Sequence, residues 1–289
     1  MNDSTARAPR IAFQGERGAF SEMAAVELLG EEIQLVPRPT FESLFAAINE
    51  GAADCVLAPI ENSLAGSVHA SYDLLLESSL TIKNEVVIPI RHCLIGCASA
   101  SFDAIRTVAS HPVALAQCGR FFAAHPQLRA VVAEDTAGSV AQAIKRGDAT
   151  CAAIAGRRAA QIYGGRILLE PLEDHPENYT RFVLLAPSTQ ESDDAADKLS
   201  LVMKLPHKPG ALYYALEPFA RRDVDLLKIE SRPIRGRPWE YHFYLDLQAS
   251  MKDRGVADAL AELSERATQV RLLGCYPSAA ANRRAALRA

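Results

Sequence analysis

Thr180-Arg181-Phe182 stands directly before the apolar run Val183-Leu184-Leu185, so a hydroxyl and a permanent cation come where a strand is expected to begin. A guanidinium presents a planar fork of donors that suits a carboxylate or a phosphate. The neighbouring hydroxyl can donate a hydrogen bond to a reacting oxygen, and Asn178 adds an amide nearby. An ordinary strand edge with a solvated arginine fits the same triplet, so the triplet alone does not decide between the two.

Three further polar clusters follow apolar runs in the first two thirds of the chain. They are the turn Gly15–Ser21, the segment Pro59-Ile60-Glu61-Asn62-Ser63 with Gly66 and Ser67, and Ser110-His111-Pro112 with Gln117. Each leads from a predicted strand into a predicted helix, where backbone N–H groups can bind an anion and where open α/β sheets bind ligands. Each also fits plain capping chemistry, with Ser21 as a helix cap and His111 held by a local hydrogen bond.

Composition narrows the kind of protein. The 289 residues are 49% hydrophobic and 23% charged with a net charge of −4, which indicates a globular chain of two or more domains. Lys and Arg are scattered, which argues against a nucleic-acid partner. The polar N-terminus lacks the apolar core of a signal peptide, so we expect a cytoplasmic protein with no membrane partner. Six dispersed cysteines show no metal-ligand spacing, and no dinucleotide loop is found, so we expect no metal and no cofactor.

Apolar runs alternate with helical patterns up to about residue 187, which predicts α/β layers. The polar, acidic stretch 188–197 reads as a linker. Beyond it, the pattern predicts a βαββαβ unit whose sheet has one face covered by two helices. A unit of about 80 residues gains from burying the other face against a second copy. The Ala-rich tail 279–289 is expected to be frayed.

These clusters together resemble the prephenate dehydratases and the related arogenate dehydratases that carry a C-terminal ACT domain. The resemblance runs almost from end to end. It implies a catalytic domain over 8–187 made of two lobes like those of a periplasmic binding protein, with the active site between them. Lobe 1 covers about 8–90 and 178–187, lobe 2 covers about 91–177, and the ferredoxin-like ACT domain covers 198–278. The matching segments are Gly18-Ala19-Phe20-Ser21, Pro59–Ser63 with Gly66-Ser67, Pro89-Ile90-Arg91-His92-Cys93-Leu94, Ser110-His111-Pro112 with Ala114–Cys118, Asn178–Phe182, His207–Leu212 and Glu230–Pro233.

In this family the reaction converts prephenate to phenylpyruvate with loss of carbon dioxide and water, as a step in L-phenylalanine biosynthesis. The resemblance implies that Arg181 binds a substrate carboxylate and that Thr180 donates a hydrogen bond to the departing hydroxyl, with Glu61 and His111 as other proton sources. The implied catalytic residues are Thr180, Arg181, Glu61, Asn62 and Ser63. The implied substrate-binding residues are Ser21, Gly66, Ser67, Ser110, His111, Gln117, Asn178 and Phe182.

Substrate choice stays open at this point. Ala19 replaces the threonine of many prephenate dehydratases, and Asp135-Thr136-Ala137-Gly138 is closer to the plant-type arogenate dehydratases. Arogenate carries an ammonium where prephenate has a keto group, so an arogenate dehydratase or a dual-specificity cyclohexadienyl dehydratase is the alternative. A non-catalytic amino-acid-binding sensor is the alternative of another class.

The second domain is expected to bind L-phenylalanine as an effector between two ACT domains, in a homodimer or a homotetramer. Plain turn chemistry also accounts for these segments. The implied effector residues are His207, Pro209, Gly210, Ala211, Leu212, Glu230, Ser231, Arg232 and Pro233.

Overall fold

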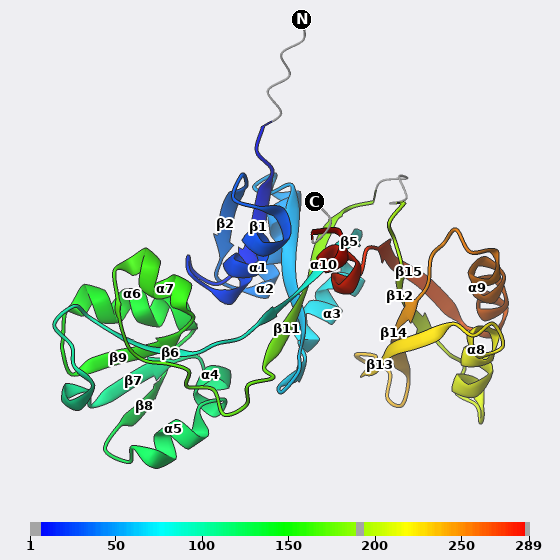
Figure 1. Cartoon of the computed structure of the whole chain (residues 1–289). Helices are drawn as coiled ribbons and strands as arrows, with labels where there is room; N and C mark the ends of the chain where they lie inside the picture. Colours follow the sequence, from blue (N-terminus) through cyan, green and yellow to red (C-terminus); the bar gives the residue numbers. More distant parts are fainter. Residues whose placement is uncertain (1–6, 189–193, 287–289) are drawn as a thin grey trace, which may run out of the picture. The chain divides into compact units, whose positions relative to one another are not determined.

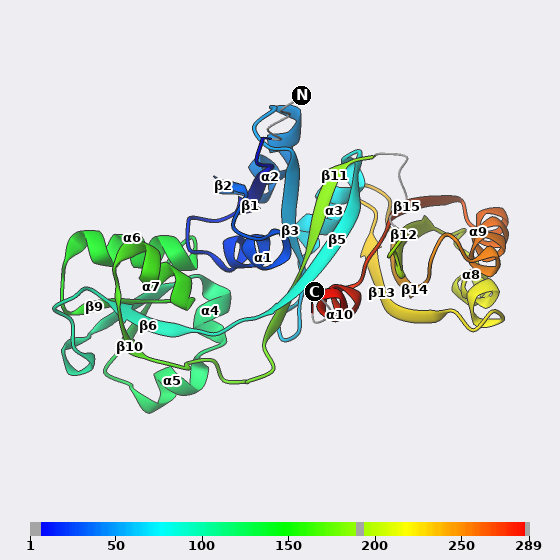
Figure 2. The same cartoon turned by 45° about the horizontal axis from the view of Figure 1, so that its top comes forward.

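The computed structural model describes residues 7–188 and 194–286, which pack into two compact units. The first unit comprises the chain up to Ser78 together with Val86–Leu184, and the second comprises Ser79–Glu85 and the chain from Leu185 onward. Figures 1 and 2 show these elements from two directions. No helix in the described residues is both long enough and apolar enough to cross a membrane.

The first unit begins with a six-stranded sheet in the order β2-β1-β3-β11-β5, with the short β4 paired to β3. β1 pairs in parallel with β2 and β3. Its Ile11-Ala12-Phe13 segment is fully buried, as expected for a strand covered on both faces. The strands are β1 (Arg10–Gln14), β2 (Gln34–Arg38), β3 (Cys55–Asn62), β4 (Gly66–Ser67), β5 (Leu80–Pro89) and β11 (Tyr179–Pro187), and the helices are α1 (Phe20–Leu29), α2 (Phe41–Asn49) and α3 (His69–Glu77).

A second sheet of the same unit has the order β10-β6-β9-β7-β8. α6 and α7 lie on one face of this sheet and α5 lies on the other (Figures 1 and 2). The elements are β6 (Cys93–Gly96), a 3₁₀ turn (Phe102–Ala104), β7 (Thr107–Ser110), α4 (Pro112–Ala116), α5 (Gly119–Ala124), β8 (Arg129–Val132), α6 (Thr136–Arg146), β9 (Cys151–Ala155), α7 (Arg157–Tyr163) and β10 (Arg166–Leu169).

The segment 112–124 forms two short helices, α4 and α5. The Asp174 carboxylate accepts hydrogen bonds from the backbone N–H groups of Gly119 and Arg120, both at 2.9 Å. These bonds cap a new helix start at Gly119 and so separate α5 from α4. The carboxylate comes from more than fifty residues downstream, and local sequence carries no signal of it.

The chain enters the second sheet after β5 and returns to the first through β11 (Figure 1). β5 and β11 are neighbours in the first sheet, so two adjacent strands lead to and from the second lobe. This arrangement confirms the predicted two-lobed α/β fold.

The second unit has the predicted βαββαβ order. Its four strands form an antiparallel sheet in the order β13-β14-β12-β15. Leu201, Leu245, Phe219 and Leu263 belong to the core between this sheet and its two helices. The elements are β12 (Lys198–Lys204), α8 (Ala211–Ala220), β13 (Asp225–Pro233), β14 (Tyr241–Gln248), α9 (Arg254–Arg266) and β15 (Gln269–Tyr276), followed by α10 (Ala279–Ala286).

The structure differs from the sequence prediction on the face of this sheet that α8 and α9 do not cover. Residues 79–85, expected in lobe 1, pack here: a Cβ on Gly274 would lie only 2.3 Å from the carbonyl oxygen of Ile82. The tail expected to be frayed forms α10, and Asn282 Nδ2 donates to Asn84 Oδ1 at 2.7 Å. The chain therefore supplies part of the cover that a second copy was expected to provide. Residues 287–289 and the linker segment 189–193 lie outside the described residues.

A buried ion pair holds residues 79–85 in the second unit. Lys198 Nζ donates to both carboxylate oxygens of Glu85, at 3.1 and 3.0 Å, and the two side chains are only 10% and 3% exposed. The backbone N–H of Ala279, at the start of α10, donates to the same carboxylate at 2.9 Å. Removing one partner of such a pair leaves an uncompensated charge in the interior.

We predict that Lys198→Met destabilises the protein by roughly 3 kcal/mol, because it leaves Glu85 charged and buried without its cation. Urea unfolding followed by circular dichroism measures this loss. The double variant Glu85→Gln/Lys198→Met should recover a substantial part of the loss. The control is Lys252→Met, which breaks an exposed pair with Asp194 and should cost much less stability. Equal losses in the two lysine variants would contradict the role given to burial.

Candidate functional site

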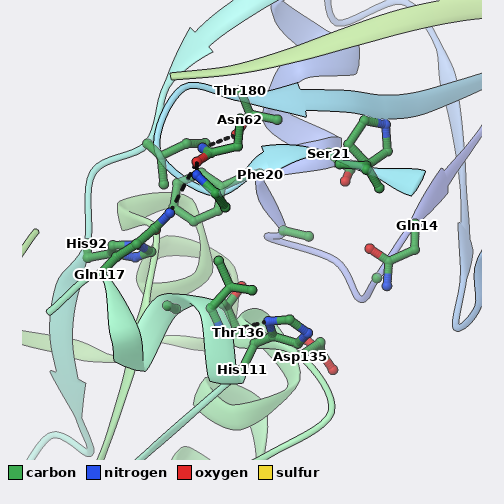
Figure 3. A pocket seen from close by; sticks show the side chains of 18 of the residues that line it. Gln14, Phe20, Ser21, Asn62, His92, His111, Gln117, Asp135, Thr136 and Thr180 are labelled. Carbon is green, nitrogen blue, oxygen red and sulfur yellow. Dashed lines mark hydrogen bonds between the residues drawn. The ribbon is translucent and has the colours of Figure 1, made fainter. Parts of the chain in front are cut away.

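A cavity of about 410 Å³ lies in the first unit, where strand ends and helix starts of both lobes meet (Figure 3). The strand ends of the first lobe, the starts of α1, α4 and α6, and β11 all contribute to its wall. Its lining includes Gln14, Ala19, Phe20, Ser21, Asn62, Gly66, Ser67, Ile90, His92, His111, Val113, Gln117, Glu134, Asp135, Thr136 and Thr180.

The side-chain amide of Asn62 at the end of β3 has one possible orientation. Its Oδ1 accepts from the backbone N–H groups of Leu64 and Ala65, at 3.0 and 2.8 Å. Its Nδ2 donates to the carbonyl of Tyr179 at 3.0 Å and to Thr180 Oγ1 at 2.9 Å. Because backbone N–H groups only donate and carbonyls only accept, a flipped amide would lose the bonds to Leu64, Ala65 and Tyr179.

Thr180 is therefore an acceptor toward Asn62. Its hydroxyl has a single proton, which is not used in the bond from Asn62 and remains available for donation. Thr180 is 9% exposed and lines the cavity near Asn62. The geometry thus presents a hydroxyl donor to a ligand in the cavity.

Gln117, Asn178 and His92 extend this network. Asn62 Nδ2 donates to Asn178 Oδ1 at 2.8 Å, Asn178 Nδ2 donates to Gln117 Oε1 at 3.0 Å, and Gln117 Nε2 donates to Asn62 Oδ1 at 3.3 Å. Gln117 Oε1 also lies 2.9 Å from His92 Nε2, which must then carry the proton. His92 Nδ1 is buried without a hydrogen-bond partner, and burial lowers the pKa of this ring. Both facts favour a neutral His92.

The start of α1 is positioned by close packing and by a buried carboxylate. Gly18 has a φ of +86°, and a Cβ there would lie 2.7 Å from Ala159 Cα, so only glycine suits this turn. Glu22 in the first turn is paired with Arg17 at 2.7 Å and with Arg158 at 2.8 Å. Burial by itself raises the pKa of Glu22, but the bonds from both arginines and from the Gly18 N–H hold its pKa below the usual value. A charged Glu22 therefore ties α1 to α7.

α1 starts without a side-chain cap, since its N-cap residue is Ala19. No side chain therefore caps its first backbone N–H groups. Phe20 and Ser21 in this first turn line the cavity. Free N–H groups at a helix start suit an anion, which is the function predicted for this turn.

The starts of α4 and α6 are capped by their own side chains. His111 Nδ1 accepts from the Val113 N–H at 3.3 Å, so a neutral His111 carries its proton on Nε2. Burial lowers the pKa of His111, and the nearby Asp135 carboxylate opposes this effect. Asp135 caps α6 by accepting from the Gly138 N–H at 2.6 Å.

Arg181 does not lie where the sequence suggested. Thr180 lines the cavity, but Arg181 is not among the lining residues, because successive side chains of a strand point to opposite faces. The Arg181 guanidinium instead lies 3.9 Å from the carboxylate of Glu61, which is also absent from the lining. Arg181 and Glu61, which were expected to contact the substrate, therefore lie outside the lining of this cavity.

Four other predicted residues are also absent from the cavity lining. Ser63 donates to the carbonyl of Glu177 and accepts from the Tyr179 N–H, both at 2.9 Å. Ser110 is fully buried and donates to the Ile154 carbonyl at 2.6 Å. Phe182 packs in the core, and Asn178 is fully buried in the network described above. Of the predicted catalytic and substrate-binding residues, the structure brings seven to the cavity: Thr180, Asn62, Ser21, Gly66, Ser67, His111 and Gln117.

Several lining residues were not predicted from the sequence. His92 stands in a segment that carried the family resemblance, and Asp135 and Thr136 stand in another, so their motifs were noticed without a role. Phe20 also lines the cavity and stands in the matching segment Gly18–Ser21, whereas the residue types of Gln14 and Glu134 alone gave no signal. No group of three or more His, Cys, Asp or Glu side chains able to hold a metal occurs in the described part of the chain.

The second unit has a cavity of its own, of about 250 Å³. Four predicted effector residues line it, namely His207, Gly210, Ala211 and Leu212. Pro209 and the segment Glu230–Pro233 are not part of its wall; the latter lies on β13. Other lining residues are Leu205, Lys208, Tyr213, Trp239, Glu240, Tyr241 and Phe243.

Comparisons with known sequences agree with this architecture. The model of a family described as prephenate dehydratase matches residues 11–190. The arogenate dehydratase/prephenate dehydratase 2 of Arabidopsis thaliana is 41% identical, covering 93% of this chain and 72% of its own length. The bifunctional chorismate mutase/prephenate dehydratase of Neisseria gonorrhoeae is 35% identical, covering 93% of this chain and 74% of its own.

Two solved structures are similar over most of the chain. Prephenate dehydratase from Arthrobacter aurescens in complex with L-Phe has a TM-score of 0.86 at 32% identity, covering 94% of this chain and 91% of that one. GqqA, described as a novel type of quorum quenching acylase, has a TM-score of 0.83 at 33% identity, covering 93% and 98%. A family match over more than half of the residues and relatives above 30% identity across nearly the whole length show that the chain belongs to the prephenate dehydratase family.

Proposed function

We propose that this protein is a lyase that converts prephenate to phenylpyruvate by decarboxylative dehydration. The observation that carries the proposal is the Thr180 hydroxyl, which accepts from Asn62 and keeps its own proton for a ligand in the cavity. The homology of the chain to enzymes named prephenate and arogenate dehydratases supports the same reaction.

In this reaction the electron pair of the bond between the ring and its carboxylate moves into the ring as carbon dioxide leaves. The shift expels the hydroxyl from the opposite ring carbon, and the hydroxide takes up one proton to form water. The Thr180 hydroxyl stabilises the developing negative charge by a hydrogen bond that strengthens as the C–O bond breaks. Aromatisation supplies the driving force, and the His111 Nε2–H is a second proton source.

Backbone donors take the place of arginine in our account of substrate binding. A buried substrate carboxylate needs compensating donors, and the uncapped start of α1 with the Ser21 and Ser67 hydroxyls provides them. Arg181 acts as a positioning residue, because its contact with Glu61 joins β11 to the end of β3, where Asn62 lies.

We also propose that the second unit is an ACT domain that binds L-phenylalanine and regulates the enzyme. The cavity containing His207, Gly210, Ala211 and Leu212 and the L-Phe complex of the Arthrobacter relative support this assignment. Feedback control requires that the effector bind two states of the enzyme with different affinity.

A homodimer, or a tetramer built from it, fits the edge strand β13. Leu227 and Ile229 on this strand are 44% and 42% exposed, which is apolar surface that a second copy can bury. We propose the cytoplasm as the compartment, although the Arabidopsis relative is named as chloroplastic.

We predict that Thr180→Val lowers kcat for prephenate by roughly 100-fold, the loss typical for one oxyanion-type donor. Valine keeps the shape of threonine, and Asn62 Nδ2 retains the acceptors Asn178 and Tyr179, so folding should be preserved. Formation of phenylpyruvate, followed by its ultraviolet absorbance, gives the rate. Thr180→Ser, which keeps a hydroxyl, is the matched control and should stay within about ten-fold of wild type. Wild-type turnover in Thr180→Val would refute the assigned role, and a wild-type protein that binds prephenate without turning it over would favour the sensor.

For the effector site, we predict that Gly210→Ala raises the L-phenylalanine concentration for half-inhibition by roughly ten-fold and leaves kcat and KM without effector unchanged. Gly210 lines the cavity with a φ of +78°, and an added Cβ would lie 2.8 Å from the Tyr214 ring. Gly236→Ala is the control, because Gly236 has a similar φ of +73° but its Cβ would meet no atom within 4 Å. Dose–response curves of the three proteins test the site, and unchanged inhibition in Gly210→Ala would place the effector elsewhere.

A further inference from the structure

The ring of His92 is held in place at the wall of the catalytic cavity. His92 is 1% exposed, and its ring meets that of Phe20 edge-on, with 5.6 Å between the ring centroids. Its backbone N–H donates to Glu173 Oε2 at 2.9 Å, and its carbonyl accepts from the Leu172 N–H at 3.0 Å. Among the described residues the ring makes one hydrogen bond, from Nε2 to Gln117 Oε1 at 2.9 Å. Backbone bonds and packing therefore fix the direction of this single donor.

Gln117 uses both lone pairs of its side-chain oxygen within the protein. Oε1 accepts from His92 Nε2 and, at 3.0 Å, from Asn178 Nδ2. Nε2 donates one of its two protons to Asn62 Oδ1 at 3.3 Å, and the other N–H has no partner in the part of the chain that the structure describes. Gln117 lines the cavity (Figure 3). The two bonds to its oxygen thus hold the amide in the orientation that leaves one N–H for a ligand.

Histidine carries a cost at this position. Its Nδ1 is buried, and no described residue donates a hydrogen bond to it. A buried acceptor without a donor destabilises a fold by at least as much as a typical hydrogen bond stabilises it. Phenylalanine here would have nearly the same shape and no such atom, and Gln117 Oε1 would still be bonded by Asn178. Stability therefore does not account for a histidine at position 92, whereas the need for a donor to Gln117 does.

We propose that His92 is a positioning residue for the reaction: its Nε2–H holds the Gln117 amide so that the unused N–H of Gln117 and the Thr180 hydroxyl are offered to the same substrate. This inference rests on the proposed dehydratase function. His92 acts through Gln117 and not on the reacting atoms. A donor that is fixed before the substrate arrives stabilises developing charge without having to move. A glutamine that has lost one of the two bonds to its oxygen samples other rotamers, and a misplaced donor slows the reaction.

The test compares His92→Phe and His92→Gln with wild type. His92→Phe deletes the donor together with the unpaired Nδ1, so we expect a Tm equal to or above that of wild type. Its kcat for prephenate should nevertheless fall roughly ten-fold, because the donors are less well placed. The amide of His92→Gln can supply a donor near the position of Nε2, so its kcat should stay within about three-fold of wild type.

His125→Phe is the matched control for replacing a histidine by phenylalanine. His125 packs against Phe102 and Phe121 in the same lobe and does not line the cavity. Its variant should leave kcat at the wild-type value.

A double-variant cycle separates positioning from packing. Gln117→Met removes the acceptor through which His92 acts, so adding His92→Phe to it should change kcat by less than about two-fold. Full additivity of the two losses would show that His92 acts independently of Gln117 and would overturn the inference.

Three other results would also overturn it. They are a wild-type kcat in His92→Phe, a His92→Gln variant as slow as His92→Phe, and a joint loss of Tm and activity in His92→Phe, which would make His92 a packing residue. Absence of prephenate turnover by wild type would instead remove the proposed function itself, so the two failures are distinguishable.

Discussion

The amide of Asn62 holds together three segments that are far apart in the chain. It accepts from the turn that follows β3, donates to the backbone and side chain of β11, and joins Gln117 at the end of α4 through Asn178. Each amide in this network donates to the oxygen of a neighbour, so the orientation of each amide follows from its neighbours. The Asn62 amide donates to the Thr180 hydroxyl, so this one side chain helps to position Thr180 and leaves the hydroxyl proton for a ligand. A cavity whose reacting donor is set in this way is preorganised, which is how a hydroxyl of ordinary acidity becomes useful in catalysis.

The cavity is built mainly from backbone dipoles and neutral side chains. Arg17 and Arg158 near α1 are engaged by the buried Glu22, and Arg181 lies by Glu61 on the other face of its strand. The cations near the site therefore support its walls and do not line it. The wall that faces a ligand consists of a helix start, hydroxyls and amides, together with the carboxylates of Glu134 and Asp135. Such a site selects by where charge is placed as much as by shape.

The second unit shows how one chain completes its own sheet. The face of the sheet away from α8 and α9 carries a polar buried set in which Ser200 bonds both Asp246 and Tyr276, and Lys198 meets Glu85. Residues 79–85 and α10 contribute to this side, which a βαββαβ pattern alone leaves open. Because the segment 79–85 is also the first part of β5, one strand belongs to both units by covalent continuity.

Local pattern was sufficient for the α/β alternation, for the βαββαβ order and for the family, since each depends on residue types at short spacing. Asn62, Thr180, Gln117 and His111, predicted from the sequence as site residues, do line the cavity, because polar side chains at strand ends gather at one edge of a sheet. Alternation along β11 predicts that Thr180 and Arg181 face opposite sides, but not which of them meets the ligand. The break between α4 and α5 and the packing of residues 79–85 depend on partners more than fifty residues away. Those contacts, and the placing of Asp135 across the cavity from Thr180, were decided only by the tertiary structure, because no periodicity within one segment encodes a neighbour from another.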